Sequence, residues 1–179
     1  MQTLDAELKT VICMRIEWME QHMANAERLI CNNEVEDGLV LLNNLLYDEP
    51  GYGSLHNHIG WAYMYYTTEA AKAEQHLKLA IRFDAEFMAP YLHLGNLYIR
   101  MGRYAEALVN LEKGLTKPNT NRVAFLESIG HAYELKREYA KAIKAYKEAL
   151  VSTVGFETTN LAEGIRRCRK KRWVMMFNF

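Results

Sequence analysis

The chain has 179 residues, of which 50% are apolar, and its 22 Lys and Arg balance its 22 Asp and Glu. This length and apolar content suffice for one sizeable core or one continuous array of packed elements, and they exclude a disordered chain. No window approaches the roughly 18 consecutive apolar residues of a transmembrane helix. The acidic start of the chain lacks the basic region of a signal peptide. We therefore expect a cytoplasmic protein, with no membrane as its partner.

The neutral total conceals a division of charge along the chain. Residues 1–87 contain 14 acidic and 6 basic residues, a net charge of −8, whereas residues 88–179 contain 8 acidic and 16 basic residues, a net charge of +8. If the elements stack in sequence order, these charges are also separated in space. The pattern predicts head-to-tail attraction between molecules at low ionic strength, weakened by salt.

The N-terminal part of the chain is predicted to be helical. From residue 3 to about residue 32 there is no Gly or Pro, and apolar residues recur at three- and four-residue steps. This periodicity predicts an amphipathic helix, either continuous or broken near residues 17–20. A second helix is expected over residues 35–47, and Pro50 follows where a helix cannot continue.

Six further helices follow in pairs. We expect them near residues 53–66 and 69–83, 88–100 and 104–116, and 122–136 and 139–152. Pro50, Pro90 and Pro118 are the three prolines of the chain, and each falls at the edge of an expected helix. A last helix over about residues 157–172 has one apolar face, which suits an element that closes the end of a helical array.

The middle of the chain repeats itself. Gly60, Gly95 and Gly130 lie 35 residues apart. Three alanines recur at intervals of 34 and 35 residues: Ala73, Ala107 and Ala142. A fixed period of this size indicates stacked supersecondary units. A glycine inside a helix costs about 1 kcal/mol relative to alanine, so its recurrence predicts a close approach of two helix backbones.

The order of aromatic, Leu, Gly, Tyr, Gly, Tyr, Ala and Leu residues from Tyr91 to Leu115 resembles the tetratricopeptide repeat. The resemblance is close over residues 53–150 and weaker over residues 19–52, and Arg137 stands where the family usually has glycine. It implies an all-α, right-handed superhelical solenoid of antiparallel helix pairs that forms one structural domain. The implied segments are a helical extension (1–18), degenerate repeat 1 (19–52), repeat 2 (53–87), repeat 3 (88–122), repeat 4 (123–156), a capping helix (157–172) and an apolar tail (173–179).

Catalytic and metal-binding motifs are absent from the sequence. There is no nucleophile elbow, phosphate-binding loop, zinc-protease helix or CxxC pair. His56 and His58 form an HxH pair, but on a helix this spacing places the two rings on different faces. We therefore expect a non-enzymatic protein that requires no cofactor and no metal.

The family resemblance implies a binding surface. In tetratricopeptide proteins the first helix of each unit lines a concave groove that binds a peptide or helix of another protein. Carried onto this chain, the groove residues are Asn57, Trp61, Tyr65, His93, Asn96, Arg100, Glu127 and His131, and Glu134 continues the same spacing. The alternative for Trp61 and Tyr65 is packing against the next helix. The lysines of the family's carboxylate clamp are missing, so an acidic chaperone C-terminus is not the expected ligand.

Three functions remain open from the sequence. The first is a scaffold or adaptor, the second a small secretion- or assembly-type chaperone, and the third a self-associating structural subunit. The basic run over residues 166–172 is interpreted as a solvated last helical turn rather than a nucleic-acid site. The tail after it is too apolar for exposure in water. We expect it to dock in the groove of its own chain or of a second copy, which would form a homodimer.

Overall fold

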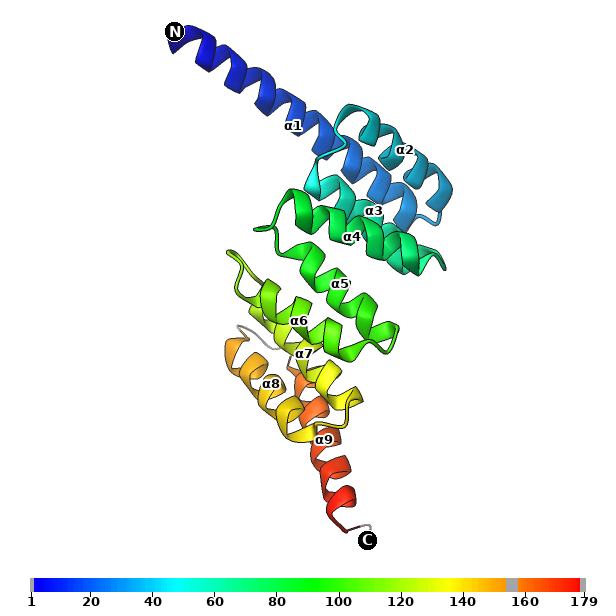
Figure 1. Cartoon of the computed structure of the whole chain (residues 1–179), viewed down its shortest axis with the longest axis vertical. Coiled ribbons are helices and arrows are strands. Elements are labelled where there is room, and N and C mark those ends of the chain that lie inside the picture. The colour runs from blue at the N-terminus through cyan, green and yellow to red at the C-terminus, as the bar shows by residue number, and fades with distance from the viewer. Residues whose placement is uncertain (1, 154–157, 178–179) are drawn as a thin grey trace. The chain divides into compact units, whose positions relative to one another are not determined.

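The computed structural model describes residues 2–153 and 158–177 (Figure 1). Over these residues the chain forms nine α-helices and no strand, and the predicted all-α fold of antiparallel helix pairs is confirmed. The helices are α1 (Gln2–Cys31), α2 (Val35–Asp48), α3 (Gly53–Tyr66), α4 (Ala70–Phe83), α5 (Ala89–Arg100), α6 (Tyr104–Leu115), α7 (Arg122–Leu135), α8 (Tyr139–Ser152) and α9 (Thr159–Phe177). None of these described helices is long and apolar enough to cross a bilayer.

The chain forms two compact units, Met1–Asp84 and Ala85–Phe179, where the sequence predicted one structural domain. In unit 1, α1 packs against α2 and α3, and α3 packs against α4. In unit 2, α5 packs against α6 and α7, and α7 packs against α8 and α9. Each unit buries an apolar core of its own, which is why the repeats divide into two groups.

Helix α1 is continuous, which decides between the two interpretations of its sequence. Its C-terminal half buries Met19, Met23, Ala26 and Ile30 against the rest of unit 1. Its N-terminal half extends past α2 and α3 as a single helix (Figure 1). The apolar stripe of α1 is therefore covered over only part of its length.

Three of the turns between paired helices share one geometry. Asn33, Gly102 and Arg137 all have positive φ angles, of 71°, 74° and 62°. After each, the next backbone amide donates to a carbonyl five residues earlier, at 2.8–2.9 Å. This closure satisfies the last carbonyls of the first helix. Asn33 and Arg137 thus adopt the same left-handed backbone conformation as Gly102. Arg137 stands where the family usually has glycine, but the turn geometry is the same.

The repeated glycines lie at close helix contacts, as their spacing predicted. A Cβ atom at Gly95 would lie 2.5 Å from Cδ2 of Leu111, and one at Gly60 would lie 2.7 Å from Cγ of Leu77. Both distances are too short for carbon atoms in contact. The absence of a side chain at Gly60 and Gly95 lets a leucine of the second helix, Leu77 or Leu111, pack against the backbone of the first.

Helix α9 is longer than predicted. The sequence predicted that the helix ends near residue 172 and that a separate apolar tail docks elsewhere. The helix instead continues to Phe177, because each added residue closes one more backbone hydrogen bond and no breaker intervenes. Val174, Met175 and Met176 are 39%, 54% and 61% exposed, so docking on the chain's own groove is wrong for these residues. Residues 178–179 of the predicted tail lie outside the described residues.

Candidate functional site

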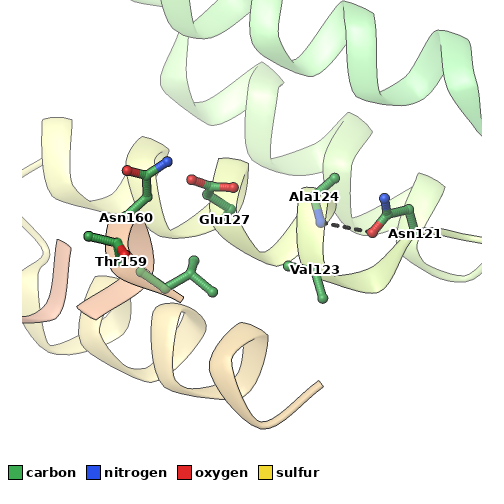
Figure 2. A pocket seen from close by; sticks show the side chains of 7 residues that line it. Asn121, Val123, Ala124, Glu127, Thr159 and Asn160 are labelled. Carbon is green, nitrogen blue, oxygen red and sulfur yellow. Dashed lines mark hydrogen bonds between the residues drawn. The ribbon is translucent and has the colours of Figure 1, made fainter. Parts of the chain in front are cut away.

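Two adjoining cavities, of about 490 Å³ and about 400 Å³, lie between α7 and α9 in unit 2. Figure 2 shows the first, with side chains from both helices around it. Both cavities are lined by Glu127 and Asn160, so they form one continuous depression, the α7–α9 groove. Its polar lining residues are Asn121, Glu127, Ser128, His131, Thr159, Asn160, Glu163 and Arg167.

Helix α7 supplies one wall. Its start is fixed by Asn121, whose side-chain oxygen accepts a hydrogen bond of 3.2 Å from the amide of Ala124 (Figure 2). Glu127 and His131 lie one turn apart and therefore share a face of the helix. Phe125 is fully buried, which orients the helix and leaves the polar face toward the groove.

Helix α9 supplies the other wall. Asn160, Glu163 and Arg167 follow at steps of three and four residues, so they also share one face. On the adjoining face of the helix, Leu161 and Cys168 are buried in the core of unit 2. The alternation of polar and apolar positions in α9 therefore determines which of its side chains reach the groove.

The ring of Tyr146 separates α7 from α9 below the groove. A Cβ atom at Gly130 of α7 would lie 2.7 Å from the ring, and one at Gly164 of α9 would lie 2.9 Å from it. Tyr146 is buried on both sides by these glycines and is only 3% exposed. Gly164 follows Gly130 by 34 residues, which is the repeat period. Helix α9 thus occupies the position of the first helix of a further unit.

A buried carboxylate joins α9 to α7. Glu134 is 5% exposed and accepts hydrogen bonds from Nε and Nη2 of Arg167 at 2.7 and 2.8 Å, and from Nζ of Lys171 at 2.8 Å. The Arg167 hydrogen bonds, aided by Lys171, lower the pKa of Glu134 to about 2. The hydroxyl of Tyr146 also donates to this carboxylate, at 3.3 Å. Two residues of the basic run, interpreted as solvated in the sequence, are therefore structural.

Glu134 is a correction to the predicted groove. The helical spacing placed it with Glu127 and His131, but its side chain is buried in the ion pair rather than open to a ligand. Nearby, burial raises the pKa of Cys168 to about 11, so this thiol stays protonated and unreactive at neutral pH.

The remaining predicted groove residues are divided between the two units. In unit 2, His93 and Asn96 are half-buried and Arg100 is exposed, all on α5, which packs beside α7. In unit 1, α3 carries the other three predicted residues, Asn57, Trp61 and Tyr65. Glu127 and His131 are the two predicted residues that line the α7–α9 groove.

The three residues on α3 differ in their surroundings. Trp61 packs against the core of unit 1, and its ring meets Tyr66 edge-on with 5.1 Å between centroids. The alternative interpretation, packing, thus explains the partial burial of the Trp61 ring. Its packing partners lie within unit 1, however. Tyr65 is 50% exposed, whereas Asn57 is 6% exposed and its Oδ1 has no hydrogen-bond partner among the described residues.

Sequence reasoning missed the contribution of α9 to the groove. The sequence predicts a capping helix over these residues, and the predicted groove does not include Asn160, Glu163 or Arg167. The signal that identifies them is Gly164, which continues the series of Gly60, Gly95 and Gly130.

The histidines of unit 1 are engaged in internal hydrogen bonds. Nε2 of His56 lies 3.0 Å from the carbonyl oxygen of Pro50, and Nδ1 lies 3.0 Å from Nδ1 of His76. Burial, with smaller contributions from His56 and Lys72, lowers the pKa of His76 to about 4. In the part of the chain that the structure describes, no group of three His, Cys, Asp or Glu side chains is placed to hold a metal ion.

Helix pairs of 34- to 35-residue period, closed by left-handed turns and glycine contacts, define a helical-repeat protein of the tetratricopeptide type. Family models described as the tetratricopeptide repeat match residues 89–116 and 126–158. Over these two segments the chain has the sequence pattern of tetratricopeptide repeats. A search of curated proteins gave no match to the sequence.

Solved structures share the fold at low sequence identity. Pseudomonas aeruginosa pilF matches with a TM-score of 0.77 at 16% identity, over 89% of this chain and 74% of that chain. Tetratricopeptide-like repeats of a putative kinesin light chain from Podosopora anserina match with a TM-score of 0.73 at 15% identity, over 87% of each chain. A thermophilic tetratricopeptide protein from Thermus thermophilus matches with a TM-score of 0.67 at 18% identity, over 85% of this chain and 80% of that one. The fold is in general that of protein–protein interaction scaffolds.

Proposed function

We propose that the protein is a non-enzymatic scaffold or adaptor that binds an extended segment of another protein along the α7–α9 groove. The observation that carries this proposal is the groove itself, in which hydrogen-bonding side chains from two adjacent helices line two adjoining cavities. Cytoplasmic action and a chaperone role stay predictions of the sequence.

The lining chemistry suits a peptide backbone. An extended segment leaves its amides and carbonyls without internal partners. The amide of Asn160 can both donate to and accept from such a backbone, and the hydroxyls of Ser128 and Thr159 can do the same. A buried apolar slot of the kind that binds an amphipathic helix would need a different lining.

The charges of the groove favour a basic side chain on the ligand. Glu127 is half-buried in the groove wall, and Glu163 is exposed on the opposite helix. Arg167 lines the same cavity, but its guanidinium is held by two hydrogen bonds to Glu134. A segment that carries Lys or Arg between Glu127 and Glu163 would therefore be bound more tightly than an acidic one.

The groove is also held rigid before any ligand binds. The contacts of Glu134 with Arg167 and Lys171, and the packing of Tyr146 between two glycines, keep α9 at a set distance from α7. Binding would then require little ordering of the protein, which lowers its entropic cost.

The test is a pull-down with a groove variant and a matched control. The groove variant is Glu127→Ala with Asn160→Ala, and the control is Glu112→Ala with Asn110→Ala on α6, so each loses one carboxylate and one amide. We expect the groove variant to lose its specific partners by about tenfold or more, because each lost hydrogen bond to a ligand contributes about 1 kcal/mol. Equal recovery of partners by both variants would contradict the proposal.

A further inference from the structure

The apolar stripe of α1 is buried at one end and exposed at the other. Met19 and Met23 are 2% and 3% exposed within the core of unit 1. Ile16 and Ile12, at three and seven residues before Met19, continue the same face of the helix but are 42% and 50% exposed. Figure 1 shows that this half of α1 has passed the ends of the helices that cover the other half.

This exposed stripe borders a hollow. Ile12, Ile16 and Met19 line a depression of about 290 Å³ together with Tyr52 and Glu49. Val11, Met14 and Trp18 add exposed apolar area on the neighbouring face, at 61%, 64% and 43% exposure. We refer to Val11, Ile12, Met14, Ile16, Trp18, Glu49 and Tyr52 as the α1 patch. A contiguous apolar surface of this kind marks an interaction site.

The end of α9 carries a second apolar surface, in unit 2. Met175 and Met176 are exposed and, with Arg172, line a shallow depression of about 370 Å³ beside Tyr139 and Lys141 at the start of α8. We refer to Tyr139, Lys141, Arg172, Val174, Met175 and Met176 as the α9 patch. Methionine side chains adapt to a partner surface because they are unbranched and flexible.

Charge distinguishes the possible pairings of these patches. The chain around the α1 patch, residues 10–20 and 48–49, contains four acidic residues and one basic residue, a net charge of −3. Residues 166–176 around the α9 patch contain six basic residues and no acidic residue. Two of the six share the single negative charge of Glu134, so five positive charges remain in excess. Contact of two α1 patches or of two α9 patches would bring like charges together, whereas contact of an α1 patch with an α9 patch joins opposite charges.

We propose that the α1 patch of one molecule docks on the α9 patch of a second copy of this chain. The contact is heterologous, since each molecule offers one surface of each kind, and it leaves a free patch at either side of a pair. Association therefore continues into longer assemblies as the concentration rises. This inference is independent of the peptide groove, whose residues belong to neither patch.

The contact is small, and it is therefore weak. The nine residues from Thr10 to Trp18 span about 14 Å of helix, much less than is needed for the roughly 800 Å² per partner of a stable interface. We expect association at protein concentrations on the order of 10–100 µM. It should weaken between about 0.1 M and about 1 M salt, as the screening length falls from about 10 Å to about 3 Å.

Sedimentation velocity on two complementary variants tests the proposal. Ile12→Glu with Ile16→Glu blocks the α1 patch, and Met175→Glu with Met176→Glu blocks the α9 patch. All four side chains are exposed, so the fold tolerates the changes, which circular dichroism verifies. Wild-type protein should form a concentration-dependent series of oligomers, and each variant alone should be monomeric. An equimolar mixture should form a one-to-one dimer, because one intact patch of each kind remains.

Two control variants carry the same kind of substitution outside both patches. Tyr47→Glu and Val151→Glu change apolar side chains that are 89% and 87% exposed outside both patches, and these variants should associate like the wild type. A monomeric wild-type protein at all concentrations would overturn the proposal. So would association of either patch variant by itself, or a mixture of the two that stays monomeric. Binding of the wild type to anionic phosphatidylserine vesicles without self-association would identify the α9 patch as a lipid contact instead and would overturn it too.

Discussion

Nε of Arg167 donates to Oε1 of Glu134 at 2.7 Å, and this contact spans 33 residues of sequence between α9 and α7. The carboxylate is buried, while the side chain of Arg167 is 49% exposed. The pair therefore has one member that depends on its partner for solvation and another that retains water on one side. Loss of Arg167 would leave the buried carboxylate with Lys171 as its remaining cationic partner, and an incompletely paired buried charge is costly.

Replacing Glu134 by Gln should destabilise unit 2. The amide keeps the shape of the side chain but gives up charge-assisted hydrogen bonds to two cations, so we expect a loss of about 2–4 kcal/mol in the free energy of unfolding. Urea denaturation followed by circular dichroism measures it. Glu163→Gln, which alters an exposed carboxylate on the same helix pair, should change stability by less than about 0.5 kcal/mol. A loss equal for the two variants would show that the buried contact contributes nothing.

The same carboxylate predicts an acid-labile unit 2. Its pKa is about 2 in the folded protein and about 4.5 in the unfolded chain. The unfolded state therefore binds the proton first, and stability that is fully present above pH 4.5 is lost as the pH falls toward 2. In Glu134→Gln this part of the pH dependence should be missing. A wild-type and a variant curve that run parallel from pH 5 to pH 2 would contradict the assignment.

His76, which is hydrogen-bonded to His56 in unit 1, predicts that the free energy of unfolding also depends on pH in a higher range. Nε2 of His56 donates to Pro50, so its Nδ1 accepts the hydrogen bond from Nδ1 of His76, and one hydrogen occupies the 3.0 Å gap. His76 takes up a further proton at its Nε2, and burial disfavours the charge that this proton brings. Because the pKa of His76 is lowered to about 4, stability should fall as the pH drops from about 6.5 to about 4.

Over this pH range we expect the free energy of unfolding to fall by on the order of 1–2 kcal/mol. The partial exposure of His76 keeps this value below that for a fully buried group. Urea midpoints at the two ends of that pH range measure it. His76→Gln should flatten the dependence, whereas His22→Gln, which changes a half-buried histidine on α1, should leave it unchanged. A slope that persists in His76→Gln would assign it to another group.

Gly95→Leu should force the helices of its pair apart. Even the first carbon of the new side chain would lie 2.5 Å from Leu111, so we expect a loss of several kcal/mol, at least about 3. Thermal unfolding measures it. Gly51→Ala is the milder control, because its Cβ would lie 3.7 Å from Phe83, an ordinary contact distance. An unchanged melting temperature for Gly95→Leu would exclude the helix register described above.

Trp61→Ala should reduce stability as well as any binding. The ring packs against the core of unit 1 and against Tyr66, so its removal should cost about 2–3 kcal/mol, less than for a fully buried tryptophan. Tyr65→Ala, which removes a half-exposed ring from the same helix, should cost under about 1 kcal/mol. If Trp61→Ala unfolds at the wild-type urea concentration, the packing of this ring contributes nothing to stability and the packing interpretation is wrong.

Local features of the sequence determined the helices and their pairing. The 35-residue spacing of Gly60, Gly95 and Gly130 predicted the close helix contacts, and these depend on residues within one helix pair. The turn at Asn33 was equally predictable, since it needs only one residue that tolerates a left-handed backbone. Helix periodicity depends on residues three and four positions apart, so it can be predicted from the local sequence.

The tertiary structure decided which helix faces are covered. Periodicity gave Glu127 and Glu134 the same face of α7, yet one lines a groove and the other is buried against Arg167. Likewise, one apolar stripe on α1 is core at Met19 and exposed at Ile12. The difference lies in whether another helix, far away in the sequence, extends over that turn. The burial of a side chain depends on helices that are distant in the sequence. The spacing of residues within a single helix does not predict where those covering helices end.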